Sequence, residues 1–331
     1  MRLLITGGSG FIGTNFIDLL LLNKHCNFIN IDKQKPLKAQ HISFWVNCNI
    51  LDRDKLNEVI NKYKPTHVLH LAAKTDTASN NLEDYKDNTE GTANLIQIIS
   101  QCETMLHVVI TSTQYVYKSK EYPLPPTDIS FAPHTAYGIS KKITEELIRN
   151  SSMNCAWTII RPTNVWGPWN MRYPNELFKI IDQGLYVHPR NIDTIKSFAY
   201  VKNVTFQIFK ILVSPTDIVN KNVFYVGDYP MNSIKWINSF SLGFTGKAVR
   251  TVPKQWLQIL ALLGDYIQKL KIPYPLNSVR FNNMIDDYDT PMKKTIDVFG
   301  ISHPNLDENV KETIHWIKNE GKPYFKYWRK K

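Results

Sequence analysis

The sequence has few cysteines and no long uninterrupted apolar segment. Its four cysteines, Cys26, Cys48, Cys102 and Cys155, are scattered and form no C-x-x-C pair, so neither a disulfide framework nor a metal site is indicated. No apolar run approaches the ~20 residues that a membrane-spanning helix needs. The first strand pattern begins at Arg2, which leaves no room for a signal peptide. These absences predict a protein of the reducing cytoplasm.

Basic residues outnumber acidic residues by 40 to 29, which gives a net charge of +11. This charge suits nucleic acid, an anionic membrane or a phosphorylated substrate. No nucleic-acid-binding module is visible, so we expect no nucleic acid partner. At the C-terminus, cations alternate with aromatic residues: Lys318, Lys322, Tyr324, Phe325, Lys326, Tyr327, Trp328, Arg329, Lys330 and Lys331. This tail has two interpretations, a membrane-interface segment and a solvated C-terminus, and we favour the second.

Apolar runs of strand length alternate with helical patterns through the first half of the chain. The strand candidates are 2–6, 27–31, 43–46, 67–73, 106–111 and 156–160, and the helix candidates are 52–63, 85–102 and 137–150. Continuous apolar strands that alternate with helices indicate a parallel sheet covered on both faces. The predicted fold class is therefore α/β, a doubly wound Rossmann sheet whose ligands bind at the carboxyl ends of the strands.

The elements become shorter after Pro168, where only 198–201 and 223–226 resemble strands. We predict a dinucleotide-binding domain over 1–168, to which elements of about 197–228 return, and a smaller substrate-binding lobe over 169–331.

The first strand runs directly into a glycine turn, Gly7-Gly-Ser-Gly10-Phe-Ile-Gly13, and then into a helical pattern. Such a turn points backbone N–H groups and the positive end of a helix at a pyrophosphate. Asp32 ends the second strand, 19 residues after Gly13, where a carboxylate accepts both ribose hydroxyls of NAD and repels the 2′-phosphate of NADP. We therefore predict an NAD site rather than an ordinary tight turn. Lys33 and Lys35 would soften this preference, but a solvated basic loop is the favoured interpretation.

Tyr137-Gly-Ile-Ser-Lys141 is the most specific catalytic signal. A helix places residues four apart on one face, so the Lys141 ammonium can stabilise the Tyr137 phenolate and lower the tyrosine pKa from about 10. Tyr137 can then take a proton from a substrate hydroxyl. Thr113 follows the strand 106–111 and offers a hydroxyl to the reacting oxygen, with a plain strand-end residue as the alternative.

With these motifs the sequence resembles the extended short-chain dehydrogenase/reductase family, in its sugar epimerase and dehydratase branch, over nearly the whole chain. The resemblance also rests on His70-Leu-Ala-Ala73, Asn88, Arg161-Pro-x-Asn164-Val-x-Gly167-Pro168 and Tyr288-Asp-Thr290. It implies Thr113, Tyr137 and Lys141 as the catalytic set. It implies NAD contacts from Gly7, Gly10, Phe11, Ile12, Gly13, Asp32, Asn49, Ile50, Leu71, Ala72, Ala73 and Lys141. It implies substrate contacts from Asn164, Lys196 and Arg280, with Arg280 as the diphosphate ligand.

Several positions depart from the family pattern. Gln114 and Tyr115 stand where the dehydratases carry an Asp-Glu acid/base pair, and nucleotide-sugar decarboxylases expect a Glu at the second position. Dehydration and decarboxylation are therefore disfavoured. Asn49 replaces an Asp that contacts adenine. Lys196 replaces the phosphate-contacting Arg of many nucleotide-sugar epimerases, which puts a point charge in place of a bidentate fork.

The helix candidate 254–271 places several apolar residues on one side between lysines: Trp256, Leu257, Leu260, Leu263 and Ile267. A core-packing helix is the favoured interpretation, and an interfacial helix is the alternative. The segments 196–204 and 254–281 resemble bacterial 4-epimerases that act on N-acetylhexosamine linked to undecaprenyl diphosphate. A lipid-linked substrate would account for a basic, aromatic protein at a membrane surface.

We therefore predict an NAD-dependent hexose 4-epimerase that acts on a sugar diphosphate, carried by UDP or by undecaprenol, in cell-surface polysaccharide synthesis. Tyr137 removes the C4 hydroxyl proton while hydride passes to the nicotinamide, and hydride returns to the other face of the 4-keto sugar. The alternatives are a 4-keto-sugar reductase that uses the same residues and a dinucleotide-sensing protein without turnover. We expect a cytoplasmic homodimer, peripheral on the inner face of the membrane if its substrate is lipid-linked.

Overall fold

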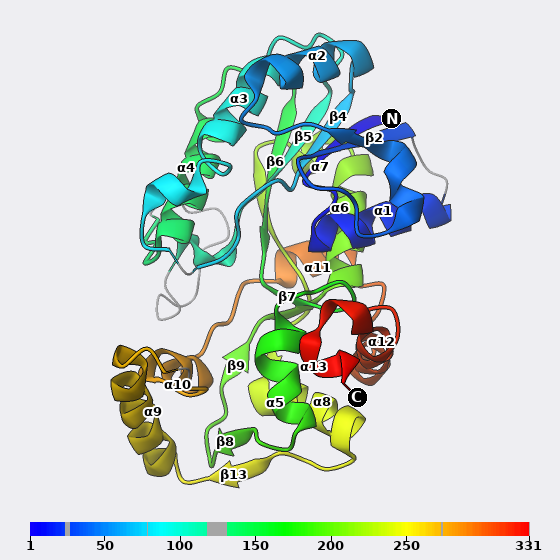
Figure 1. Ribbon diagram of the computed structural model, residues 1–331. Coiled ribbons are helices and arrows are strands. Elements are labelled where there is room, and N and C mark those ends of the chain that lie inside the picture. The colour runs from blue at the N-terminus through cyan, green and yellow to red at the C-terminus, as the bar shows by residue number, and fades with distance from the viewer. Residues whose placement is uncertain (24–26, 78, 118–130, 273, 331) are drawn as a thin grey trace. The chain divides into compact units, whose positions relative to one another are not determined.

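A parallel sheet forms the centre of the first half of the chain (Figure 1). The computed structural model describes residues 1–23, 27–77, 79–117, 131–272 and 274–330, so Cys26 and Lys331 lie outside the described residues. The sheet has seven strands in the order β11-β6-β5-β4-β1-β2-β3, and every pairing is parallel. Its strands are β1 (Arg2–Thr6), β2 (Asn27–Asp32), β3 (Trp45–Asn47), β4 (His67–His70), β5 (His107–Thr111), β6 (Ala156–Pro162) and β11 (Asn222–Val226).

Helices cover both faces of this sheet, as the strand pattern predicts. Helices α1 (Phe11–Asn23) and α6 (Val201–Val213) pack on one face, and α2 (Arg53–Tyr63), α3 (Glu90–Ile99) and α4 (Ala136–Arg149) pack on the other. Neighbouring side chains of β1 enter different cores, since Leu3 lies in the cluster with α1 and Leu4 in the cluster with α2. The predicted α/β fold class with a doubly wound parallel sheet is confirmed.

Three predicted elements differ in extent, and the strand expected over 67–73 ends at His70. The run 43–46 is the end of a 3₁₀ helix, η1 (Ala39–Phe44), followed by the short strand β3. The helix expected over 85–102 is shorter. A 3₁₀ turn, η2 (Leu82–Tyr85), precedes it, and its N-cap Asn81 accepts a hydrogen bond from Glu83 N. Asn88, expected within this helix, lies in the turn between η2 and α3.

The chain divides into two compact units. Unit 1 comprises Met1–Val165, Phe198–Tyr229 and Thr290–His303. It therefore includes α7 (Thr216–Val219) and α11 (Lys293–Phe299), although the predicted boundary assigned 290–303 to the substrate lobe. The correction has a simple cause, because Phe299 packs edge to face on Phe224 of β11 with 5.0 Å between ring centroids.

Unit 2 comprises Trp166–Ser197, Pro230–Asp289 and Pro304–Lys331. Its helices are α5 (Lys179–Asp182), α8 (Ser233–Thr245), α9 (Lys254–Lys269), α10 (Ser278–Ile285), α12 (Leu306–Lys318) and α13 (Lys326–Arg329). Short strands that the sequence pattern did not predict also occur: β8 (Val187–Pro189), β9 (Ile195–Lys196), β12 (Met231–Asn232) and β13 (Arg250–Val252). The strand β7 (Asn164–Trp166) pairs with β10 (Phe198–Tyr200) where unit 1 ends.

The C-terminal tail buries two of its aromatic side chains, so both predicted interpretations are wrong for Phe325 and Trp328, whereas Tyr324 is 43 % exposed. Phe325 is 0 % and Trp328 2 % exposed. Trp328 stacks on Phe244 of α8 with 5.3 Å between ring centroids, and the Tyr327 hydroxyl donates to Asp182. Aromatic side chains spaced through a basic tail bury well when a hydrophobic neighbour is within reach.

Helix α9 also departs from the favoured core-packing interpretation. Its only buried residues are Leu257, Ala261 and Gly264, whereas Trp256 is 64 % exposed. Among the described residues, no helix is both long enough and apolar enough to cross a membrane.

Candidate active site

The glycine turn after β1 is shaped by close backbone contacts. Gly7 has φ +72°, and a Cβ atom on it would lie 2.5 Å from the backbone N of Ala72. A Cβ on Gly13 would lie 2.4 Å from Gly8 Cα. Only glycine allows this left-handed conformation and these approaches without strain. Helix α1 begins at Phe11, directly after the turn, so its first N–H groups, Ile12 included, have no intrahelical partner.

Two side chains of β2 hold the turn in place. The Asn30 side-chain oxygen accepts from Gly8 N at 2.8 Å, and the Asn30 amide donates to Ser9 Oγ at 3.1 Å. The Asp32 carboxylate accepts from Ser9 N at 3.1 Å and from Gln34 N at 2.9 Å. Sequence reasoning missed Asn30, for which the available signal is a polar residue inside an otherwise apolar strand.

The Asp32 carboxylate can accept further hydrogen bonds from a ligand. Each of its carboxylate oxygens accepts one backbone hydrogen bond, and a carboxylate has about four acceptor sites. Burial raises the pKa of Asp32 above its usual range, against the hydrogen bonds from Gln34 and Ser9, which lower it. The adjacent Lys33 ammonium lies 2.5 Å from Asp87 Oδ2. Its charge is thus already paired, which removes one source of attraction for a 2′-phosphate.

The residues after β3 and β4 reach the same edge of the sheet, because parallel strands end together. Asn49 oxygen accepts from Leu51 N at 3.1 Å in the turn that leads to α2, and Ile50 is 5 % exposed. Leu71, Ala72 and Ala73 follow β4. Leu71 N donates to the Thr6 carbonyl at 2.9 Å, and Ala72 N donates to Thr6 Oγ1 at 3.2 Å.

His70 and Asn88 connect the end of β4 with α3 and α4. The His70 ring lies between the Thr6 hydroxyl at 2.6 Å and the Thr92 hydroxyl at 2.9 Å, and burial lowers its pKa to about 3. A neutral His70 is therefore a structural connector. Asn88 Nδ2 donates to Ser140 Oγ of α4 at 2.8 Å, and Asn88 Oδ1 accepts from Lys74 N at 2.8 Å.

The predicted catalytic residues lie together at the carboxyl end of β5. Thr113 follows β5 and hydrogen-bonds the side chain of Tyr137, which is in the first turn of α4. Lys141 lies one turn further along α4 and is 1 % exposed. The Thr135 hydroxyl caps α4 by accepting from Gly138 N at 3.0 Å. The cap and the helical spacing place Tyr137 and Lys141 on one buried face.

Burial governs the protonation of this pair in the protein without ligands. Burial raises the pKa of Tyr137, against the hydrogen bond with Thr113, which lowers it. Burial lowers the pKa of Lys141 to about 8, against the Glu145 carboxylate, which raises it. Tyr137 thus keeps its proton here. The predicted lowering of its pKa therefore needs positive charge beyond what the protein alone supplies at this hydroxyl.

A buried ion pair follows one turn beyond Lys141. The Glu145 carboxylate accepts two hydrogen bonds of 2.8 Å from Arg161 of β6, and both side chains are fully buried. The guanidinium lies 5.3 Å from the Tyr117 ring centroid and 5.4 Å from that of Tyr225. Sequence reasoning quoted Arg161 only as part of a motif and missed Glu145, whose signal is its spacing of four from Lys141.

Gln114 and Tyr115 are turned toward Asn164. The Asn164 side-chain oxygen accepts from Gln114 Nε2 at 3.1 Å and from the Tyr115 hydroxyl at 3.4 Å. Tyr115 also packs edge to face on Tyr137, with 6.4 Å between ring centroids. Gln114 is fully buried. A neutral amide and a phenol thus occupy the positions after Thr113, and they position a predicted substrate residue instead of forming a carboxylate pair.

The other predicted substrate residues, Lys196 and Arg280, belong to unit 2. Lys196 of β9 donates to the Asn283 carbonyl in the last turn of α10, and burial lowers its pKa. Its charge thus supports a helix C-terminus. The Arg280 guanidinium donates to the Pro275 carbonyl at 2.6 Å. Lys196 does not line the pocket that holds Arg280.

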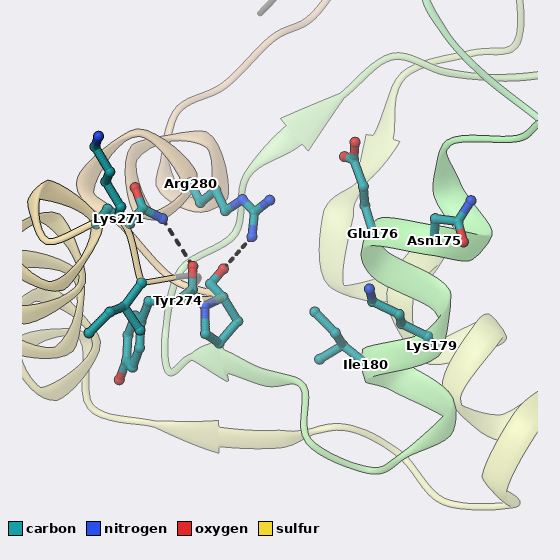
Figure 2. Close-up of a pocket in the computed structure, with 10 residues that line it drawn as sticks. Asn175, Glu176, Lys179, Ile180, Lys271, Tyr274 and Arg280 are labelled. Carbon is teal, nitrogen blue, oxygen red and sulfur yellow. Dashed lines mark hydrogen bonds between the residues drawn. The ribbon is translucent and has the colours of Figure 1, made fainter. Parts of the chain in front are cut away.

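That pocket measures about 570 Å³ and is rich in cations (Figure 2). One wall carries Lys271 and Arg280, and the other carries Lys179 and Glu176, the single acidic residue of the lining. Three cations against one carboxylate favour an anionic ligand. Sequence reasoning missed Lys179 and Lys271, because nothing in their local pattern separates them from surface lysines.

The carboxyl edge of the sheet therefore combines a pyrophosphate-type turn, a ribose-type carboxylate and a Thr/Tyr/Lys set. These features define a dinucleotide-dependent enzyme of the short-chain dehydrogenase/reductase type. The sequence profile of the NAD dependent epimerase/dehydratase family matches residues 3–227. The chain belongs to this family.

Relatives with named activities are distant. The chain is 26 % identical over 339 residues to a putative UDP-glucose 4-epimerase of Methanocaldococcus jannaschii, with 97 % of this chain and 99 % of that protein covered. It is 28 % identical over 207 residues to the N-acetyl-alpha-D-glucosaminyl-diphospho-ditrans,octacis-undecaprenol 4-epimerase of Escherichia coli O157:H7, with 61 % of this chain and 60 % of that protein covered.

Solved structures share the fold over nearly the whole chain. The UDP-glucose 4-epimerase of Thermotoga maritima, crystallised with UDP-glucose, superposes with a TM-score of 0.73 at 19 % identity, covering 97 % of this chain and 99 % of that one. The predictions of the family, of an NAD-dependent enzyme and of NAD as its cofactor are confirmed.

Proposed function

We propose that this protein is a 4-epimerase of a hexose linked to a diphosphate, with Thr113, Tyr137 and Lys141 as its catalytic residues. The observation that carries the proposal is the hydrogen-bonded Thr113 and Tyr137, with Lys141 one turn away. This set lies at the carboxyl edge of the sheet whose β1 turn and Asp32 fit NAD.

Each catalytic residue has a separate task in this reaction. Tyr137 accepts the proton of the substrate C4 hydroxyl as hydride leaves C4, and it returns the proton when hydride adds to the other face. When bound, NAD supplies the hydride acceptor and donor, so no net oxidant is consumed. Thr113 hydrogen-bonds the reacting oxygen and orients it. Lys141 places a positive charge behind the developing phenolate. The charge stabilises the phenolate most strongly where water is excluded.

The chemistry of Gln114 and Tyr115 supports epimerisation over dehydration. Removal of the 6-hydroxyl needs an acid and a base beside the sugar. Gln114 has no titrating proton, and its amide is bonded to Asn164. We infer that Asn164, held by Gln114 and Tyr115, contacts the sugar.

We infer that NAD is held by the backbone of the glycine turn, by Asp32 and by the residues that end β3 and β4. The proposed contacts are Gly7, Gly10, Phe11, Ile12, Gly13, Asp32, Asn49, Ile50, Leu71, Ala72, Ala73 and Lys141. The spare acceptor capacity of Asp32 and the paired charge of Lys33 support NAD over NADP.

The diphosphate of the substrate is the proposed ligand of Arg280, together with Lys179 and Lys271 of the same pocket. Lys196 is proposed to act there only after exchanging its bond to the Asn283 carbonyl. The relative from Escherichia coli O157:H7 acts, by its name, on an undecaprenyl diphosphate sugar, which supports a lipid-linked N-acetylhexosamine as substrate. With that substrate the protein would serve polysaccharide synthesis as a cytoplasmic homodimer peripheral to the membrane.

One incubation tests the proposal. Purified protein without added cofactor is given UDP-N-acetylglucosamine or polyprenyl diphosphate N-acetylglucosamine, and the products are separated for the C4 epimer. The expected result is the epimer from at least one substrate, because bound NAD is regenerated in each cycle. Turnover only with added NAD(P)H and a 4-keto sugar would identify a reductase instead. An absence of turnover with every sugar tested would favour the dinucleotide-sensing alternative.

A further inference from the structure

Helix α9 presents a broad apolar surface to solvent, which we call the α9 outer face. Its residues, on α9 and the position after it, are each at least 40 % exposed: Trp256, Ile259, Leu260, Leu262, Leu263, Tyr266 and Leu270. At about 100° per residue these side chains span an arc of roughly 160°. A globular helix usually turns its apolar arc inward. Here the wide arc points outward.

The opposite face of α9 fixes the helix in this orientation. Leu257 and Ala261 pack with Phe281 of α10 in one buried cluster. A Cβ on Gly264 would lie 1.8 Å from the Leu276 carbonyl oxygen, so the chain approaches α9 where only glycine fits. Asp265, the only acidic residue of α9, accepts from Ser278 N at 3.0 Å at the start of α10. The outer face therefore cannot turn inward without loss of these contacts.

Cations flank the outer face at both ends of α9. Lys254 is the first residue of α9, Lys269 is the last, and Lys271 follows the end of the helix. Lys269 and Lys271 are exposed. An apolar arc flanked by lysines fits a helix that lies in a membrane interface, with its lysines at the headgroups. Trp256 and Tyr266 add the amphipathic rings that favour this depth.

The charges also argue against a second copy of this chain as the occupant. A twofold contact brings the same surface of two subunits together. Pairing two α9 outer faces would bring lysine-bearing helix ends together in either helix direction, with Asp265 already engaged by Ser278. Anionic lipid instead complements the lysines at both ends at once.

We propose that the α9 outer face docks this protein on an anionic lipid bilayer by inserting its apolar side chains among the acyl chains. In the C-terminal tail, Phe325 and Trp328 are buried and do not supply inserting side chains. This inference rests on α9 alone and does not depend on the proposed function. It also assigns the membrane contact to one face of unit 2.

Co-sedimentation with vesicles tests the proposal without any substrate. Wild-type protein is expected to bind phosphatidylcholine vesicles that contain phosphatidylglycerol, to bind less at high salt, and to bind pure phosphatidylcholine weakly. The variant Leu262→Glu/Leu263→Glu should lower the partition coefficient by about tenfold per leucine. The matched control, Leu106→Glu/Leu185→Glu, makes the same charge change at leucines that are 60 % and 67 % exposed elsewhere. It should bind nearly as wild type.

Two further readouts separate insertion from charge attraction and from self-association. Brominated lipids should quench the fluorescence of Trp256, and this quenching should be absent in Trp256→Phe. Retained NAD and an unchanged melting temperature show that each variant is folded. The proposal is overturned if wild type ignores anionic vesicles, if the two double variants lose binding equally, or if Trp256 is not quenched. It is also overturned if light scattering shows that the α9 variant only converts a dimer to monomer.

Discussion

Replacing Tyr137 by phenylalanine removes one oxygen atom and leaves the ring in its contacts. The ring centroid lies 6.1 Å from that of Tyr85 and 6.4 Å from that of Tyr115. The variant loses the hydrogen bond with Thr113, which costs about 1 kcal/mol and lowers the melting temperature by only ~2–4 °C in a chain of this size. Loss of an acid/base group slows turnover by about 10²–10⁴-fold. Folding should therefore be nearly intact while catalysis almost disappears.

The assay compares initial rates of C4 epimer formation, retained NAD and thermal melting for wild type and Tyr137→Phe. The matched control is Tyr85→Phe. Tyr85 is the ring that packs against Tyr137. The control removes its hydroxyl, which donates to the Asp76 carbonyl at 2.9 Å and the Ser79 carbonyl at 3.2 Å. We expect the control to keep activity within a few-fold of wild type. A Tyr137→Phe enzyme with comparable activity would refute Tyr137 as the proton acceptor.

Four further outcomes follow from the contacts described. Asp32→Ala should weaken NAD by about tenfold or more and relax discrimination against NADP; titration that finds wild type preferring NADP would contradict the cofactor assignment. Glu145→Gln should cost about 3–5 kcal/mol in urea unfolding because it leaves the buried Arg161 charge without a carboxylate, whereas Glu145→Leu/Arg161→Met should recover most of that loss. Arg280→Ala should raise KM with kcat nearly unchanged, and a pure kcat loss would argue against diphosphate binding. Burial lowers the pKa of Lys141 to about 8, so the folded protein binds fewer protons than the unfolded chain between about pH 8 and 10.5. The free energy of unfolding should therefore rise with pH in that range. Lys141→Met should remove this rise, and a variant that keeps the wild-type slope would contradict the assignment to Lys141.

The sheet and its turn were predictable because their signals are local. Strand-length apolar runs, the glycine spacing and Asp32 each follow from the chain near them. The side-chain contacts that hold the sheet and its turn in place were not predictable. Asn30, on the next strand, hydrogen-bonds Gly8 and Ser9. Glu145 hydrogen-bonds Arg161, which lies on a strand 16 residues further along the chain. Such pairs depend on tertiary register, which one sequence does not specify.

Helix α9 shows why an apolar pattern alone misleads. Its leucines occupy most directions around the axis, so periodicity cannot say which side faces the protein. The small residues Ala261 and Gly264 mark the packed side because they allow close approach. The C-terminal tail misleads in the opposite way. Its alternating aromatics and cations suit either solvent or membrane, and only the position of Phe244 explains why Trp328 is buried.

The fate of a deuterium label at C4 tests the central claim most directly. N-acetylglucosamine deuterated at C4, carried by UDP or by a polyprenyl diphosphate, is incubated with the purified protein without added cofactor, and mass and NMR spectra of the products are recorded. If hydride leaves C4 and returns within one active site, the epimer keeps its deuterium at C4 and no reduced cofactor accumulates. Release of the label into free reduced cofactor, or an epimer that carries hydrogen at C4, would contradict the proposed 4-epimerase.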